Sequence, residues 1–246
     1  MNLSLQGGES IMLRKILTTS LTLVLTVALT GCGGASTKET AQTPVPKTIT
    51  AAAAAEQSAV PALQGKKILI AYFSYSNNTY KTAQLLQNKI GGDFFAIEPA
   101  TPYSTTDYRS VDSQGLREVR SGYKPPLKNK LANIADYDVI FLGSPIWWGT
   151  MAPPVATFLG EHDLANKTVV PFCTHGGYGA GSYFADTAKA APNARVLTGL
   201  ALDRRSVPGA ALLNADGVDE KLPPEELQKY PPADSELDNW LQNLQL

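Results

Sequence analysis

Short apolar runs recur along the chain from residue 66 onward, and segments with helical periodicity lie between them. The runs are at residues 67–73, 94–98, 138–143, 168–174 and 195–202. Several are apolar at nearly every position, which is typical of strands that are covered on both faces. Five such strands alternating with helices predict an α/β fold, a doubly wound five-stranded parallel sheet with helices on both faces.

Three segments place their apolar residues on one face of a helix. They are Ala83, Leu86 and Ile90; Val155, Phe158 and Leu159; and Leu237, Trp240, Leu241 and Leu244. Residues 99–136 and 203–233 break the alternation, because both are long, polar and rich in proline. We interpret these two stretches as surface excursions, and connections of this length are often functional.

The chain begins with a segment of a different kind. Arg14 and Lys15 precede a mainly apolar run that starts at Ile16 and ends in Leu-Thr-Gly-Cys at residues 29–32. The run is short for a membrane span, which needs about 20 apolar residues. The segment resembles a bacterial lipoprotein signal peptide, which implies cleavage before Cys32 and a lipid on its thiol. An ordinary secretory signal or a buried helix is the alternative, and both Met1 and Met12 are candidate translation starts.

Residues 33–65 are rich in Gly, Ala, Ser, Thr, Pro and Gln and have no amphipathic face. Such a composition buries too little apolar surface to offset the entropy lost on ordering. A flexible tether of this length would hold a domain about 30 Å from a bilayer on average. The predicted organisation is therefore a signal peptide at residues 1–31, a lipidated N-terminus and linker at residues 32–65, and one folded domain at residues 66–246.

Charge and cysteine content exclude several classes of protein. Twenty-one Lys and Arg residues balance 22 Asp and Glu residues, so the chain lacks the basic excess of most nucleic-acid-binding proteins. Once Cys32 is lipidated, Cys173 has no partner for an intramolecular disulfide. Cys173 lies within an apolar strand, where we expect it to pack rather than to react. With only two histidines, we expect no metal site.

Polar side chains follow the first strand and directly precede the first helix: Ser74, Ser76, Asn77, Asn78 and Thr79. In a parallel α/β sheet, ligands bind at the carboxyl ends of the strands, and the free N–H groups of a helix start favour an anion. The loop matches neither the P-loop nor the dinucleotide-binding glycine motif. Because it contains no Lys or Arg, it suits a phosphate monoester better than a triphosphate with magnesium. The alternative is a simple helix cap and turn that binds no ligand, since such a turn uses the same types of residue.

Two further loops follow the third and fourth strands. The first contains Pro145, Ile146, Trp147, Trp148 and Gly149, and the second contains Thr174, His175, Gly176, Gly177 and Tyr178. Adjacent tryptophans on an extended chain point in opposite directions, so both are seldom core residues. A flat aromatic ligand would explain them, and the glycines would let the backbone approach it closely. Core packing and a flexible surface loop remain the alternatives.

Together these motifs resemble one known family. The sequence Tyr-Phe-Ser-Tyr-Ser-Asn-Asn-Thr at residues 72–79 resembles the phosphate loop of flavodoxin-like proteins. The motifs at residues 143–149 and 174–177 resemble the flavin-ring loops of the flavodoxin/quinone-reductase superfamily. The resemblance implies bound FMN, with its phosphate on the first loop and its ring between the other two. Where the family pattern has glycine, this chain has Asn77, which also accepts a left-handed backbone, so we expect FMN binding to be retained but weaker.

The resemblance implies an FMN-binding electron-transfer flavoprotein, lipid-anchored to a membrane of the bacterial cell envelope outside the cytoplasm. Its expected partners are a redox protein or a small electron acceptor, with no nucleic acid. One alternative is an FMN-dependent NAD(P)H or quinone reductase. Another is a lipoprotein that uses the same fold for ligand binding or interaction without a redox function. Asn77 and the two excursions are consistent with this second alternative.

Overall fold

The computed structural model describes residues 60–246. The predicted signal peptide, Cys32 and most of the predicted linker lie outside the described residues. Between Val60 and the C-terminus, no helix combines the length and the apolar character needed to cross a bilayer.

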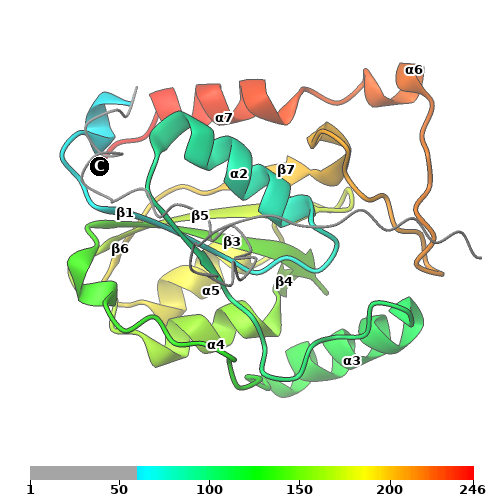
Figure 1. The fold of residues 1–246 in the computed structure, drawn as a ribbon, viewed down its shortest axis with the longest axis horizontal. Coiled ribbons are helices and arrows are strands. Elements are labelled where there is room, and N and C mark those ends of the chain that lie inside the picture. The colour runs from blue at the N-terminus through cyan, green and yellow to red at the C-terminus, as the bar shows by residue number, and fades with distance from the viewer. Residues whose placement is uncertain (1–59) are drawn as a thin grey trace, which may run out of the picture. The chain divides into compact units, whose positions relative to one another are not determined.

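The described part is built on one sheet with strand order β2-β1-β3-β5-β6 (Figure 1). The strands are β1 (Ile68–Tyr72), β2 (Asp93–Ala96), β3 (Val139–Trp147), β5 (Thr168–His175), β6 (Arg195–Val196) and β7 (Leu200–Asp203). All of them pair in parallel. β6 pairs with the start of β5 and β7 with its end, so together they occupy the fifth position. The predicted five-stranded parallel sheet is confirmed, with its last strand in two pieces rather than one.

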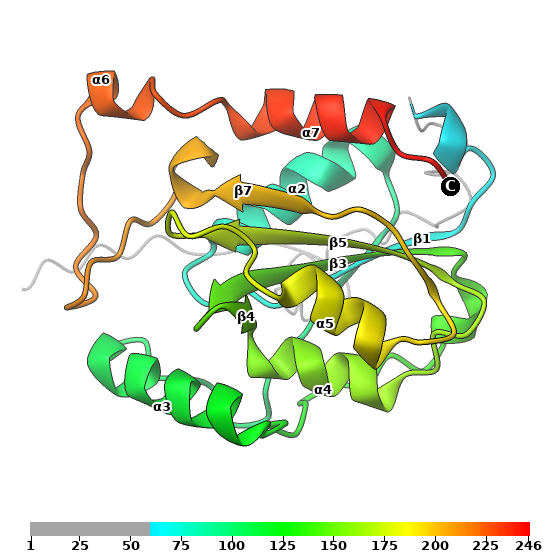
Figure 2. The same ribbon diagram turned by 180° about the vertical axis from the view of Figure 1, so that it is seen from behind.

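Helices cover both faces of the sheet (Figures 1 and 2). The α-helices are α2 (Asn78–Ile90), α3 (Tyr108–Ser121), α4 (Pro153–Glu161), α5 (Tyr183–Ala190), α6 (Pro224–Leu227) and α7 (Ala233–Gln242), and the 3-10 helices are η1 (Pro61–Leu63), η2 (Ile134–Asp136) and η3 (Arg204–Ser206). α2 and α7 lie on one face, and α4 and α5 lie on the other. α2, α4 and α7 are the three predicted helices.

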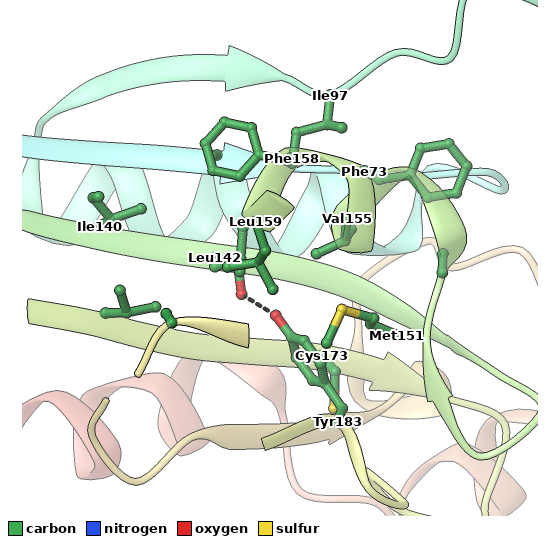
Figure 3. Packing of buried hydrophobic residues seen from close by; sticks show 14 of the residues in the cluster. Phe73, Ile97, Ile140, Leu142, Met151, Val155, Phe158, Leu159, Cys173 and Tyr183 are labelled. Carbon is green, nitrogen blue, oxygen red and sulfur yellow. Dashed lines mark hydrogen bonds between the residues drawn. The ribbon is translucent and has the colours of Figure 1, made fainter. Parts of the chain in front are cut away.

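Side chains of the central strands alternate between two buried layers. Leu69 and Leu142 belong to the layer under α4 and α5, whereas Ile70 and Phe141 belong to the layer under α2 and α7. Both layers are buried, which explains why the strand sequences are apolar almost continuously. In the α4–α5 layer, the buried Tyr183 donates a 2.7 Å hydrogen bond to the carbonyl of Leu142 (Figure 3).

Cys173 lies in this same layer and is fully buried (Figure 3). Burial raises the pKa of its thiol to about 12, so the reactive thiolate is not populated at neutral pH. The predicted packing role is confirmed.

Three stretches differ from the sequence-based expectations. The excursion at residues 99–136 contains α3, a helix that is polar overall and buries only Val111, Gly115 and Glu118. Residues 144–147 extend β3, and Thr150–Met151 form the short antiparallel strand β4, so the loop itself is reduced to a turn at Trp148 and Gly149. Val60 and Leu63, within the expected tether, pack in the layer under α2 and α7.

Candidate functional site

A cavity of about 450 Å³ opens at the carboxyl ends of β1, β3 and β5. The predicted site residues that line it are Ser76, Asn78, Pro145, Ile146, Trp147, Trp148, Gly149, Thr174, His175, Gly176 and Tyr178. The predicted residues outside its lining are Ser74, Asn77, Thr79 and Gly177. The fold therefore brings all three predicted loops to one cavity, which we call the site cavity.

The start of α2 carries unused hydrogen-bond donors. Within residues 60–246, the backbone N–H groups of residues 75–79 donate to no protein acceptor, and the Ser76 hydroxyl has no protein partner. Asn77 turns the chain into the helix with a left-handed φ of 63°, as its place in the motif predicts. Five successive free N–H groups at a helix N-terminus form a preorganised anion site, to which the helix dipole adds attraction.

Other side chains of the first loop are occupied in bracing it. The hydroxyl of Thr79 lies 2.8 Å from that of Thr174, which joins the first loop to the third. The carboxamide of Asn78 accepts from the Ala211 N–H and donates to the Ala211 carbonyl, each at 2.8 Å. Ser74 Oγ accepts from the Tyr80 N–H at 3.1 Å but keeps its own proton for another acceptor. These residues hold the loop in shape, and Ser74 also keeps a free donor.

The second loop is a tight hairpin between β3 and β4. Its two turn residues, Trp148 and Gly149, have φ values of 49° and 84°, as a type I′ turn requires. Positive φ is costly for a bulky side chain. The indole N–H of Trp148 donates to the Asp112 carbonyl at 3.1 Å, and the Ser182 N–H donates to the Gly149 carbonyl at 2.8 Å. Both bonds hold the strained turn in place.

The two tryptophans of this loop differ in their surroundings. Trp147 is half-buried and makes edge-to-face contacts with Phe73, Tyr75 and Tyr103, with ring centroids 4.9 to 6.0 Å apart. Trp148 is 51% exposed. The Trp147 ring is therefore fixed within the cavity wall, and the Trp148 ring is exposed at the edge of the cavity.

His175 lines the cavity as a neutral imidazole. Its Nδ1 accepts from the Gly177 N–H at 3.1 Å, which places the proton on Nε2. Burial lowers the pKa of His175 below its ordinary value of 6.5. Asp203, whose carboxylate is 3.8 Å away, raises this pKa, and Arg205 lowers it. Asp203 favours the imidazolium only weakly because it already forms a two-pronged ion pair with Arg205.

Both excursions contribute residues that the sequence analysis missed. α3 supplies Tyr108, Val111, Asp112 and Gly115, and the segment after β7 supplies Arg204 and Leu213. Arg204 is the only Lys or Arg among the described residues that line the cavity. Its position immediately after the fifth strand, at the carboxyl edge of the sheet, was a usable signal.

The sequence model of the flavodoxin family matches residues 67–212, more than half of the chain, and the protein belongs to that family. Its strand order, 2-1-3-5-6, is that of flavodoxin. No curated protein gave a significant match.

Three solved structures illustrate the similarity. A protein assigned as a flavoprotein from Bacteroides eggerthii DSM 20697 is 36% identical (TM-score 0.53), and the match covers 58% of this chain and 94% of the other. A second, from Bacteroides uniformis ATCC 8492, is 32% identical (TM-score 0.53; 62% and 96% covered). A flavoprotein from Lactobacillus acidophilus NCFM, solved in complex with FMN, is 26% identical (TM-score 0.49; 58% and 95% covered).

The environment of His175 gives a pH-dependent prediction. Because its pKa is lower in the folded than in the unfolded protein, its contribution to stability is complete above pH 6.5 and is lost as the pH falls through the folded value. NMR titration should show His175 neutral at pH 7, with a midpoint below 6.5. The free energy of unfolding should fall more steeply below pH 6.5 in the wild type than in His175→Asn. A His175 midpoint above 6.5 would contradict this assignment.

Proposed function

We propose that the protein is an FMN-dependent electron-transfer protein whose cofactor occupies the site cavity. The observation that carries this proposal is the row of free N–H groups at residues 75–79, at one end of a cavity with Trp147, Trp148 and a glycine-rich loop in its walls. A ligand with a phosphate and a planar ring joined by a short chain would fit both the free N–H groups and the walls of the cavity. FMN, the cofactor of the flavodoxin family, has this form.

The cavity suits FMN in size and in chemistry. Its volume of about 450 Å³ lies within the range of about 300 to 1,000 Å³ usual for small-molecule sites. The N–H groups of residues 75–79 and the Ser76 hydroxyl would hold the phosphate, and the hydroxyl of Ser74 would add a donor. The two tryptophans would flank the ring, and His175 would offer its Nε2–H.

When bound, FMN supplies the redox chemistry, while the protein orients it and limits the access of water. The chain's own groups around the cavity favour this role. Cys173 is held as a buried thiol, and the His175 imidazole is neutral, so neither competes as a charged nucleophile. The electron acceptor would be a redox partner protein or a small molecule that reaches the exposed edge at Trp148.

The proposed location is the cell envelope, with the domain tethered to a membrane by lipid on Cys32. The support is the order of basic residues, apolar run and Leu-Thr-Gly-Cys at residues 14–32. The several acyl chains of a lipoprotein anchor firmly, whereas one chain binds only marginally.

The phosphate loop can be tested with one substitution. Ser76→Ala removes a hydrogen bond to a charged group, worth about 1.5 to 3 kcal/mol, so FMN affinity should fall by roughly 10- to 100-fold. Riboflavin lacks the phosphate, so its affinity should not change. Titration of the apoprotein with each flavin measures both affinities, with Ser235→Ala at an exposed position of α7 as the control. Equal losses for the two flavins, or equal wild-type affinities, would contradict this placement of the phosphate.

The anchor is tested separately. In a bacterial host fed with labelled fatty acid, the wild type should carry label and sediment with membranes. Cys32→Ser should lose both properties, because the thiol that receives the lipid is gone. Continued labelling and processing of the Cys32→Ser protein would rule out this residue as the lipidation site.

A further inference from the structure

The two excursions meet beside the site cavity. Arg109, near the start of α3, donates from Nε to Asp216 Oδ1 at 2.8 Å and forms a second bond to it from Nη2. Next to this ion pair, the backbone of Gly217 lies against Tyr108 so closely that a Cβ on Gly217 would be 2.3 Å from the tyrosine Cβ. Figures 1 and 2 show this part of the chain, in orange between β7 and α6, reaching toward α3.

The segment that makes this contact, residues 211–219, is here called the strap. Its tip is a tight turn in which Asn214 Oδ1 accepts from the N–H groups of Asp216 and Val218, at 2.9 and 3.0 Å. Its two sides are joined where the Leu212 N–H donates to Asp219 Oδ1 at 2.8 Å. Its first residue, Ala211, is bonded to Asn78. The strap is therefore fixed at its start, by the bonds of Ala211 to the phosphate loop, and at its tip, by the bonds of Asp216 to α3.

The strap also fixes Arg204. Nη1 of Arg204 donates to the Leu213 carbonyl at 2.9 Å, and the guanidinium carbon lies 3.7 Å from the place where a Cβ of Gly176 would be. In the part of the chain that the structure describes, the remaining guanidinium N–H groups have no protein acceptor. Both Arg204 and Leu213 line the cavity. A half-buried cation with unused donors is thus held against the third loop.

We infer that Arg204 pairs with the negative charge of the reduced flavin ring and that the strap positions it to do so. This inference rests on the proposed function. Two-electron reduction with uptake of one proton leaves the ring with one negative charge, whereas the oxidised ring is neutral. Apart from Arg204, the described residues that line the cavity are neutral, except Asp112, which carries a negative charge. Such surroundings disfavour an anion. Arg204 therefore raises the reduction potential by binding the reduced form more tightly than the oxidised form.

The position of Arg204 favours the ring over the phosphate. Its guanidinium lies on Gly176, in the loop assigned to the ring, while the phosphate end already has the five N–H groups of residues 75–79. The guanidinium also acts on Tyr108 across the cavity. Burial and then Asp112 raise the pKa of the Tyr108 hydroxyl, and Arg204 opposes them, so the hydroxyl stays protonated as a further neutral donor.

The test is a redox titration of the holoprotein against reference dyes, with FMN and again with riboflavin as the bound flavin. Arg204→Gln should weaken binding of the reduced flavin about tenfold relative to the oxidised flavin, which lowers the two-electron midpoint by about 30 mV. The shift should be the same with either flavin. Arg204→Lys should keep most of the wild-type potential, and Arg195→Gln, at the opposite end of the fifth strand, should keep all of it.

A charge swap tests the strap. Asp216→Arg places like charges at its tip and should lower the midpoint in the same direction as Arg204→Gln, by a smaller amount. Adding Arg109→Asp restores the ion pair in reverse and should recover the potential. This recovery would show that the strap acts by position, since neither residue lines the cavity.

Two outcomes would overturn the inference. One is an unchanged midpoint in Arg204→Gln. The other is a loss of FMN affinity with no change for riboflavin and no change in potential, which would place Arg204 on the phosphate instead. A wild-type protein that binds neither flavin would contradict the proposed function itself, and this result is visible before any variant is made.

Discussion

Five successive backbone N–H groups at the start of α2 have no acceptor within the described protein, and the architecture of the site follows from this. Buried or half-buried donors are costly unless a partner satisfies them, so the loop at residues 75–79 requires an anion or water. Other groups of the protein brace the loop. Thr79 is bonded to Thr174, and Asn78 is bonded on both sides to Ala211.

The bracing connects the phosphate loop with the rest of the cavity. Thr174 begins the glycine-rich loop, and Ala211 begins the strap that ends on α3. The loop at residues 75–79 is therefore joined to the glycine-rich loop and to the strap by a few direct hydrogen bonds. The hairpin at Trp148 and Gly149 forms the opposite wall, where strain in the turn is held by bonds from Trp148 to Asp112 and from Ser182 to Gly149.

The sheet, three of its helices and the three site loops could be predicted because each depends on local pattern. Continuous apolar runs indicate strands that are buried on both faces, and Asn77 indicates a turn with a left-handed backbone. Arg204, Asp112 and the paired carboxamide of Asn78 could not be placed in the same way. Their roles depend on contacts between segments far apart in the sequence: 36 residues separate Asp112 from Trp148, and 133 separate Asn78 from Ala211. α3 was missed because its stretch of sequence is polar overall and because a glycine and a glutamate occupy two of its three buried positions.

The account is tested most directly by the amide resonances of residues 75–79 in ¹H–¹⁵N NMR spectra of the apoprotein. Addition of FMN should move several of these signals strongly downfield, because their protons become hydrogen-bonded to a phosphate. Riboflavin should bind in the cavity and shift the signals of residues 147–149 and 175–178 while leaving the first group nearly unchanged. If FMN and riboflavin produced the same shifts at residues 75–79, these N–H groups would not hold the phosphate.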